Sequence, residues 1–336
     1  MAVKKMGQQT IRFPLPPKII SAYSIVGPKE GEGPLKDWFD EILEDDMYKE
    51  KTWEKAESKM LRTAINASLK NCRKTPEDID FLLSGDLLNQ LMSASYMARD
   101  LKIPFYGLYG ACSTMTESLS LASVLIDGGF ADHVIAATSS HFSTAERQYR
   151  FPLEHGNQKP PTAQWTVTGA GALILAAQGA GPVITHITAG KVVDYGVSDA
   201  NNMGAAMAPA AVDTIAMHLS DTGRSPDFYD MILTGDLGQF GMQIAKDLLT
   251  EKGFNVESVY NDCGVMIFDS INQDTHCGGS GCGCSASVFC GNIFKRMTKK
   301  ELKNVLLVST GALLSTISTQ QGESIPGIAH AVAVSI

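Results

Sequence analysis

The sequence has no excess of basic residues: 36 Asp and Glu outnumber 28 Lys and Arg, which gives a formal net charge of −8. This excludes a general affinity for nucleic acid, because no basic surplus is available to neutralise phosphates. No apolar run approaches the roughly 18–20 residues that cross a bilayer, so we expect no transmembrane helix. Residues 1–9 turn polar directly after two lysines, and we expect no export signal.

The sequence also lacks the cysteine count of a disulfide framework. It has seven cysteines, an odd number, and in a chain that is not exported these predict reduced thiols. We therefore expect the protein in the cytosol or on a surface that faces it. The chain is rich in apolar residues, which make up 44% of the sequence. Its length of 336 residues is enough for about two domains of ordinary size.

Two segments of the chain repeat one another. Residues 74–87 read KTPEDIDFLLSGDL, and residues 224–237 read RSPDFYDMILTGDL. Further matching pairs keep the same order in both parts of the chain: 19–26 with 183–188, 110–113 with 281–285, and 134–137 with 305–308. Several matches in one order predict two homologous halves, which we place at residues 1–180 and 181–336.

Each half alternates strand-like and helix-like segments, which predicts an α/β fold with parallel strand pairs and crossover helices. Residues 134–137 and 169–175 are apolar or small throughout, as in strands covered on both faces. We expect residues 27–51 to form an insertion or a surface excursion, and the charged run 37–59 to be a solvated helix face. An amphipathic helix is indicated by the spacing of Ala56, Met60, Ala64, Ile65 and Leu69.

Cys112 follows an extended apolar segment and a glycine, and Ser113 begins a helical run. A cysteine at a helix N-terminus lies near unpaired N–H groups and the positive end of the helix dipole, which lower the thiol pKa and favour a nucleophilic thiolate. The same N–H groups can instead hold a carboxylate ligand. The alternative interpretation is a buried structural cysteine.

The two-fold repeat, the Gly-Ala-Cys-Ser turn at 110–113 and the Thr-Gly-Ala-Gly-Ala segment at 168–172 resemble the thiolase-like superfamily, especially its ketoacyl synthase III-type condensing enzymes. The resemblance covers essentially the whole chain. It implies a five-layer α/β sandwich of two duplicated βαβαβαββ halves, a homodimer, no cofactor, and Cys112 as the residue that corresponds to the acyl acceptor.

The sequence departs from these enzymes at two catalytic positions. Where they carry a His and an Asn, this chain has Asp236 and Cys282. An ionised Asp236 only accepts hydrogen bonds, and Cys282 donates weakly, whereas condensation needs donors for a developing oxyanion. Since the loss of one such donor commonly costs about 2.7–4 kcal/mol, we interpret Cys112 as a vestigial nucleophile. The alternative is an acyltransferase or condensing enzyme that uses Cys112 as acyl acceptor.

Residues 12–13, 109–115 and 309–315 resemble a branch of this superfamily that belongs to spore-forming bacteria. This resemblance implies a non-catalytic binding protein for dipicolinic acid (pyridine-2,6-dicarboxylate), required for its uptake into the developing spore. It also implies membrane-embedded partner proteins and a peripheral location on the cytosolic face of the forespore inner membrane. A purely structural member of a membrane-associated complex is a third interpretation.

A dianionic ligand needs cationic or N–H partners. Residues 147–165 are expected to form a loop over the pocket mouth, and Arg150 is the first candidate among its basic residues. His141 follows a strand whose end faces the pocket in the superfamily, so a ligand-facing role and a structural role are equally plausible. Asp86 or Asp236 can instead hold a loop through backbone N–H groups. The candidate ligand-binding set is Cys112, Asp86, His141, Arg150, Asp236 and Cys282.

Four cysteines in the second half, with His276 beside them, raise the question of a metal site. Their spacing, C-x4-C-x-C-x5-C, matches neither the paired ligands of zinc sites nor the plant-type iron–sulfur loop. Residues 279–283 also lack the Gly-Lys-Ser/Thr ending of a phosphate loop. We therefore expect no metal, and a tight glycine-rich turn followed by a helix that buries the small residues Cys277, Cys282, Cys284 and Cys290.

Overall fold

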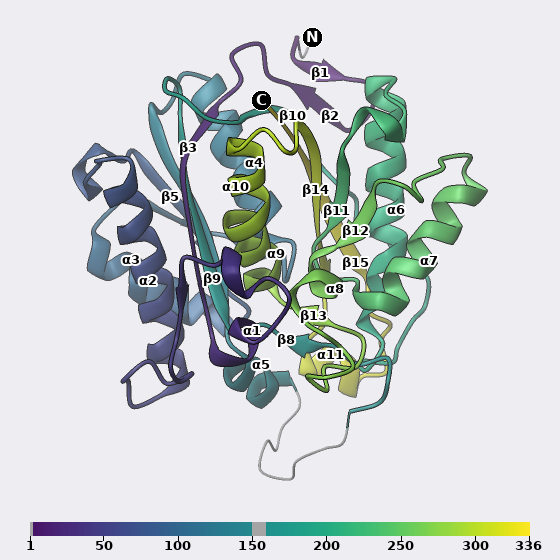
Figure 1. The fold of residues 1–336 in the computed structure, drawn as a ribbon. Coiled ribbons are helices and arrows are strands. Elements are labelled where there is room, and N and C mark those ends of the chain that lie inside the picture. Colours follow the sequence, from purple (N-terminus) through teal and green to yellow (C-terminus); the bar gives the residue numbers. More distant parts are fainter. Residues whose placement is uncertain (1–2, 150–158) are drawn as a thin grey trace.

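The computed structural model describes residues 3–149 and 159–336, and Figure 1 shows an α/β sandwich with helices outside and between two sets of strands. Helices α2 and α3 cover one outer face, α6 and α7 cover the other, and α4, α9 and α10 lie in the middle. The predicted α/β fold is confirmed. These helices are α2 (Trp53–Asn71), α3 (Met92–Leu101), α4 (Thr114–Asp127), α6 (Met203–Thr222), α7 (Gly238–Glu251), α9 (Cys282–Val288) and α10 (Phe294–Thr298).

The strand order is mirrored about the centre of the sheet. It runs β12-β11-β14-β15-β10-β3-β9-β7-β5-β6, so the first half of the chain supplies one side and the second half supplies the other. The predicted boundary near residue 180 falls between β9 and β10, and the division into two domains stays a prediction. The strands are β3 (Lys18–Val26), β5 (Phe81–Gly85), β6 (Phe105–Gly107), β7 (His133–Ser140), β9 (Gly169–Ala176), β10 (Val183–Thr188), β11 (Met231–Thr234), β12 (Tyr260–Asp262), β14 (Asn304–Ala312) and β15 (Gly327–Ser335).

Only part of the sheet is parallel, which corrects the sequence-based expectation. β5 pairs in parallel with β6 and β7, and β11 pairs in parallel with β12 and β14. β9 and β15 are antiparallel to both of their neighbours. Among the described residues, the helices that precede these two strands are the short α5 (Phe142–Tyr149) and α11 (Thr316–Gln320), which lie near the site described below.

Smaller elements complete the described chain. β8 pairs with β13 and joins the segment after α5 to the turn before α9. A π-helical segment, Phe289–Ile293, connects α9 to α10. The remaining strands and helices are β1 (Lys5–Met6), β2 (Thr10–Arg12), β4 (Glu41–Ile42), β8 (Trp165–Thr166), β13 (Gly279–Ser280), α1 (Pro28–Gly31) and α8 (Cys263–Ile267).

Helix α2 forms where the spacing of apolar residues predicts it. Thr52 caps its N-terminus, accepting a hydrogen bond from the Lys55 backbone N–H at 3.3 Å. The side chains of its apolar stripe, among them Met60 and Ile65, are fully buried against β3 and β9. Burying such a stripe is the main source of a helix's stability in a folded protein.

The middle layer depends on close backbone contact between α9 and β9. A Cβ atom on Gly171 would lie 2.5 Å from the carbonyl oxygen of Ala286, and one on Gly283 would lie 2.5 Å from the carbonyl oxygen of Gly169. Only glycine allows these approaches. The run of small residues in β9 therefore sets how closely the central helix packs on the sheet.

Two expectations about the N-terminal region are wrong. Residues 27–51 are not only a surface excursion, because Leu35, Phe39 and Leu43 are buried in the core and β4 pairs with β3. The charged run 37–59 is not one helix face either, since the helix begins at Trp53. The charges in this run indicated exposure to solvent. They did not define a helix, because apolar residues do not recur at helical spacing before residue 53.

Candidate ligand-binding site around Cys112

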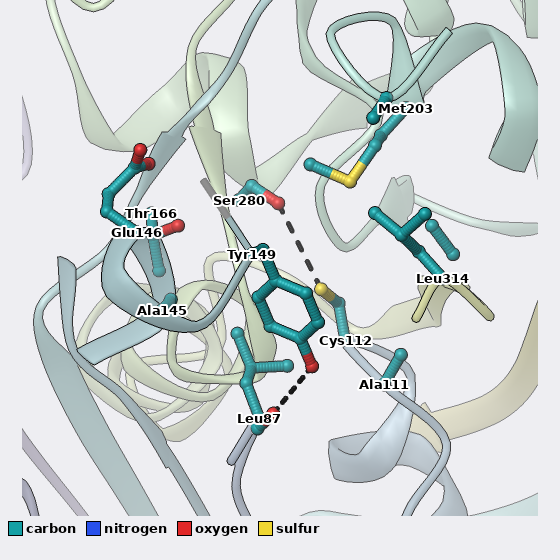
Figure 2. A pocket seen from close by; sticks show the side chains of 12 residues that line it. Leu87, Ala111, Cys112, Ala145, Glu146, Tyr149, Thr166, Met203, Ser280 and Leu314 are labelled. Atoms are coloured by element: carbon teal, nitrogen blue, oxygen red, sulfur yellow. Dashed lines mark hydrogen bonds between the residues drawn. The ribbon is translucent and has the colours of Figure 1, made fainter. Parts of the chain in front are cut away.

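A largely apolar cavity lies beside Cys112, at the ends of strands from both halves of the chain (Figure 2). Three of its walls come from the Cys112 turn, from α5 and from the start of α6. The segments around β13 and after β14 complete it. The lining residues are Leu87, Ala111, Cys112, Ala145, Glu146, Tyr149, Thr166, Ala200, Met203, Ser280, Ala312 and Leu314.

A tight turn holds Cys112 at the cavity. Ala111 takes a left-handed conformation with φ 50°, which is unusual for a residue with a side chain. The turn is closed by hydroxyl groups: Ser113 donates to the carbonyl of Gly110 at 2.7 Å, and Thr114 donates to that of Ala111 at 2.7 Å. Helix α4 begins at Thr114, as predicted, so Cys112 lies two residues before the first helical residue.

Asp236, from the other half of the chain, lies against the thiol of Cys112. Its buried carboxylate accepts hydrogen bonds from Ser280 Oγ at 2.9 Å, from the Gly281 N–H at 3.1 Å and from Thr310 Oγ1 at 2.5 Å. The Cys112 thiol is a further donor to it, and Ser280 Oγ is 4.0 Å from Cys112 Sγ.

The predicted lowering of the Cys112 pKa is wrong. Burial raises the pKa of this thiol well above its ordinary value, and the negative charge of Asp236 raises it further. The helix N-terminus therefore does not dominate this thiol's surroundings. The sequence could not show this, because the burial of the thiol and the approach of a carboxylate from a distant part of the chain both depend on the fold.

Cys282 lies behind the cavity, at the first position of α9. It packs with Cys112, Leu87 and Ala145 in a small buried cluster. Its thiol donates a hydrogen bond to the backbone carbonyl of Ser139 at 2.9 Å. The donor capacity of Cys282 is therefore directed at the protein backbone.

Asp86 follows directly after β5 and Asp236 lies two residues after β11, but the carboxylate of Asp86 has different partners. It accepts hydrogen bonds from the backbone N–H groups of Leu88, at 2.7 Å, and Ala94, at 2.6 Å. These bonds fix the loop that leads into α3. The contacts of Asp86 match the structural alternative that the sequence left open.

A family model described as stage V sporulation protein AD matches residues 7–335 of this chain. The chain belongs to this family. The stage V sporulation protein AD of Bacillus subtilis (strain 168) is 49% identical over 330 residues, which cover 98% of this chain and 97% of that protein. The family name places its members in sporulation, and a sporulation role is what the comparison supports here.

Solved structures show the same fold at low sequence identity. The 3-oxoacyl-[acyl-carrier-protein] synthase III of Aquifex aeolicus VF5 aligns with a TM-score of 0.57 and 14% identity, over 95% of this chain and 100% of that one. The E117D variant of Xanthomonas campestris OleA, bound with cerulenin, aligns with a TM-score of 0.61 and 13% identity, over 98% of both chains. These neighbours confirm the predicted thiolase-like sandwich for this member of the stage V sporulation protein AD family.

Of the other residues predicted for the site of this family member, His141 is not among the lining residues, and Arg150 is not described. His141 is fully buried, and its Nε2 lies 2.8 Å from the Asp46 carbonyl oxygen, while its Nδ1 accepts from the Ser143 N–H at 3.1 Å. Burial lowers the pKa of His141. Arg150 falls outside the described residues. Its neighbour Arg147 forms an ion pair with Glu54.

Sequence reasoning missed three cavity residues. Tyr149 lies between Leu87 and Cys112 (Figure 2) and donates to the Leu87 carbonyl at 2.7 Å. Glu146 lines the cavity and forms an ion pair with Lys159. Ala145 and Tyr149 are four residues apart, a spacing that would place both on one face of a short helix. This signal was available in a segment that we interpreted as a loop.

Glu57 is a buried acid that sequence reasoning also missed. It accepts hydrogen bonds from Ser139 Oγ at 3.1 Å and from Thr144 Oγ1 at 2.9 Å. Burial raises the pKa of Glu57, and the nearby charge of Asp86 raises it further. Its position in the apolar stripe of α2, three residues before Met60, was the available signal.

The cysteine-rich segment has the predicted conformation, a glycine-rich turn followed by a helix with buried cysteines. Within residues 3–149 and 159–336, no group of three or more His, Cys, Asp or Glu side chains is arranged to hold a metal ion. Among the helices of the same described ranges, none combines the length and apolar character needed to cross a membrane.

Proposed function

We propose that this chain is a non-catalytic binding protein for dipicolinic acid and serves the uptake of that compound into the developing spore. Its family membership supports the sporulation part of this proposal. The single observation that carries the non-catalytic part is the contact between Cys112 and Asp236. Because of this contact, the site holds a protonated thiol where the condensing enzymes need an activated nucleophile.

Condensation of acyl thioesters requires a thiolate and hydrogen-bond donors for the oxyanion. In this site burial and the Asp236 carboxylate both favour the neutral thiol of Cys112. Asp236 offers acceptor oxygens where the resemblance implies a histidine, and the thiol of Cys282 donates to Ser139. The groups that surround Cys112 therefore favour retention of the thiol proton.

The lining of the cavity suits an aromatic ring. Leu87, Ala145 and Leu314 provide apolar walls, and the ring of Tyr149 lies beside Cys112 (Figure 2). A pyridine ring buries well against such walls, while a few polar groups fix its orientation. On this proposal, membrane-embedded partner proteins deliver or receive the ligand at the cytosolic face of the forespore inner membrane, and the chain acts as a homodimer.

One observation favours a second candidate function, acyl transfer. Cys112 lies in a tight turn before α4 with its side chain at the cavity, which is the placement that a nucleophile needs. On this alternative, Cys112 Sγ attacks the carbonyl carbon of a thioester, Asp236 receives the thiol proton, and the C–S bond of the substrate breaks so that its thiolate leaves and takes up that proton.

Isothermal titration calorimetry of the purified chain with dipicolinate and, separately, with acyl-coenzyme A distinguishes the two functions. We expect heat of binding with dipicolinate, and loss of it in Cys112→Trp, which fills the cavity. Ile271→Trp is the control, since Ile271 is 89% exposed and is not a lining residue of the cavity. An acylated Cys112 in intact-mass spectra, together with no dipicolinate heat, would establish the second function instead.

A further inference from the structure

A buried ion pair forms part of the cavity wall. Lys159 Nζ lies 2.8 Å from Glu146 Oε1, and the side chains are only 11% and 7% exposed. Glu146 is a lining residue and Lys159 is not, so the ammonium group is held at the cavity wall by its pairing with Glu146. Lys159 Nζ also donates to the Gln164 carbonyl at 3.3 Å.

Aromatic rings help to hold the ammonium group in place. Lys159 Nζ lies 4.8 Å from the ring centroid of Phe142 and 4.9 Å from that of Trp165. These two rings stack on one another at 3.9 Å, and Thr166, next to Trp165, is a lining residue. Cation–π contacts of this kind favour a charged group that has left water.

The charges at the cavity do not by themselves suit an anionic ligand. Of the described lining residues, Glu146 is the one that carries an ionisable carboxyl or amine, and Asp236 lies beneath Cys112. A dicarboxylate would meet negative charge at both places. Among the described residues, Lys159 is the cation that contacts a lining residue, and its ammonium group is already paired with Glu146.

We propose that Lys159 is the carboxylate receptor of the cavity and that a ligand carboxylate binds its ammonium group in exchange for Glu146. This inference rests on the proposed function and names the recognition residue for the same site. Glu146 acts as a resident competitor: it keeps the buried ammonium paired while the cavity is empty, since an unpaired buried charge is strongly unfavourable. Only ligands with a carboxylate displace it, so the pair determines specificity for ligand charge.

The exchange predicts opposite effects for the two partners. Glu146→Gln removes the competing charge and should tighten dipicolinate binding by about tenfold, while Lys159→Met should weaken it by at least that factor. Lys159→Arg keeps the charge and should bind within about threefold of the wild type. Neutral pyridine-2,6-dicarboxamide should bind no better to Glu146→Gln than to the wild type.

Lys159→Met leaves Glu146 buried without this partner, and the variant can fail to fold for that reason alone. The double variant Lys159→Met/Glu146→Gln removes both charges and should fold while still binding dipicolinate at least tenfold more weakly. Lys29→Met is the matched control. Lys29 Nζ lies 4.1 Å from the same Trp165 ring but hydrogen-bonds to the Gln273 carbonyl and does not line the cavity.

Calorimetric titration with dipicolinate, with circular dichroism to verify folding, decides the proposal. A wild type that binds dipicolinate and a folded double variant that binds it equally well would overturn the role of Lys159 and leave the proposed function standing. A wild type that binds no dipicolinate would overturn both. Equal weakening in Lys29→Met and in the double variant would show that the Trp165 environment, not the ion pair, controls binding.

Discussion

The thiol of Cys112 is a hydrogen-bond donor to the carboxylate of Asp236, and the two residues come from opposite halves of the duplicated chain. Three further donors converge on the same carboxylate, from Ser280, Gly281 and Thr310. The interaction therefore connects the Cys112 turn to the ends of two strands and to the start of α9. Burial has the largest effect on the pKa of the Cys112 thiol, and the charge of Asp236 has the next largest.

Asp236→Asn should make Cys112 more reactive. The substitution keeps the size of the side chain but removes the negative charge that raises the thiol pKa, so the thiolate fraction at pH 8 should increase. We expect alkylation by iodoacetamide to accelerate severalfold, because the thiolate is the reactive form. The rate is measured by peptide mass spectrometry.

Cys72 provides the internal control for this experiment. It is partly exposed near the end of α2, far from Asp236 in the fold, and its alkylation rate should not change. Dipicolinate should slow the reaction at Cys112 alone. Equal rates for Cys112 in the wild type and in Asp236→Asn would show that burial by itself determines the reactivity of the thiol.

The sequence predicted the fold well because the information for it is local and repeated. The apolar spacing of α2 and the repeat between residues 74–87 and 224–237 identify elements that the structure confirms. The antiparallel placement of β9 and β15 was missed, because strand direction depends on how the chain turns between strands. Periodicity within a strand carries no such information.

The site was predicted less completely than the fold. Cys112, Asp236 and Cys282 do come together, as the resemblance implied. The ion pair between Glu146 and Lys159 was missed because its partners lie on either side of a segment without periodic pattern. The direction of the Cys112 pKa shift was wrong because a helix N-terminus is visible in sequence, whereas burial and a distant carboxylate are not.

Glu30 should make stability depend on pH. It is buried, and burial raises its pKa to about 7, so the folded state holds this proton more tightly than the unfolded chain does. The stabilisation that comes from this tighter proton binding is fully present below the ordinary carboxyl pKa. It is lost as the pH rises through about 7. The free energy of unfolding should therefore fall by about 3 kcal/mol from this residue between pH 4.5 and pH 8.5.

Glu30→Gln should remove that dependence, because the amide oxygen can still accept the Thr168 N–H that Glu30 Oε1 accepts at 2.9 Å. Urea unfolding of both proteins at pH 5 and pH 8.5 gives the comparison. Glu32→Gln, at an exposed position nearby, is the control and should follow the wild type at both pH values. A fall in the free energy of unfolding between pH 5 and pH 8.5 that is equally large in Glu30→Gln and in the wild type would assign it to other buried acids, such as Glu57.

Membrane association should require partner proteins if the proposed location is correct. We expect the isolated chain not to float with vesicles of neutral phosphatidylcholine in a density gradient, and to float when the vesicles contain the membrane proteins of the same transport system. Tight binding to the protein-free vesicles would contradict this and would show direct attachment to lipid.

A final prediction separates the binding protein from an enzyme. On the proposed function, Cys112→Ala should weaken dipicolinate binding only about threefold, through lost packing in the cavity, and should abolish no turnover. Asp236→His with Cys282→Asn should replace the acceptor at Cys112 by donors and permit acyl transfer to the thiol, which intact-mass spectra detect after incubation with acyl-coenzyme A. This double variant should also be less stable, by about 1–3 kcal/mol for each donor among Ser280, Gly281 and Thr310 that is left without an acceptor. If the wild type turns over acyl thioesters and Cys112→Ala loses that activity completely, Asp236 is a catalytic base and the non-catalytic proposal is wrong.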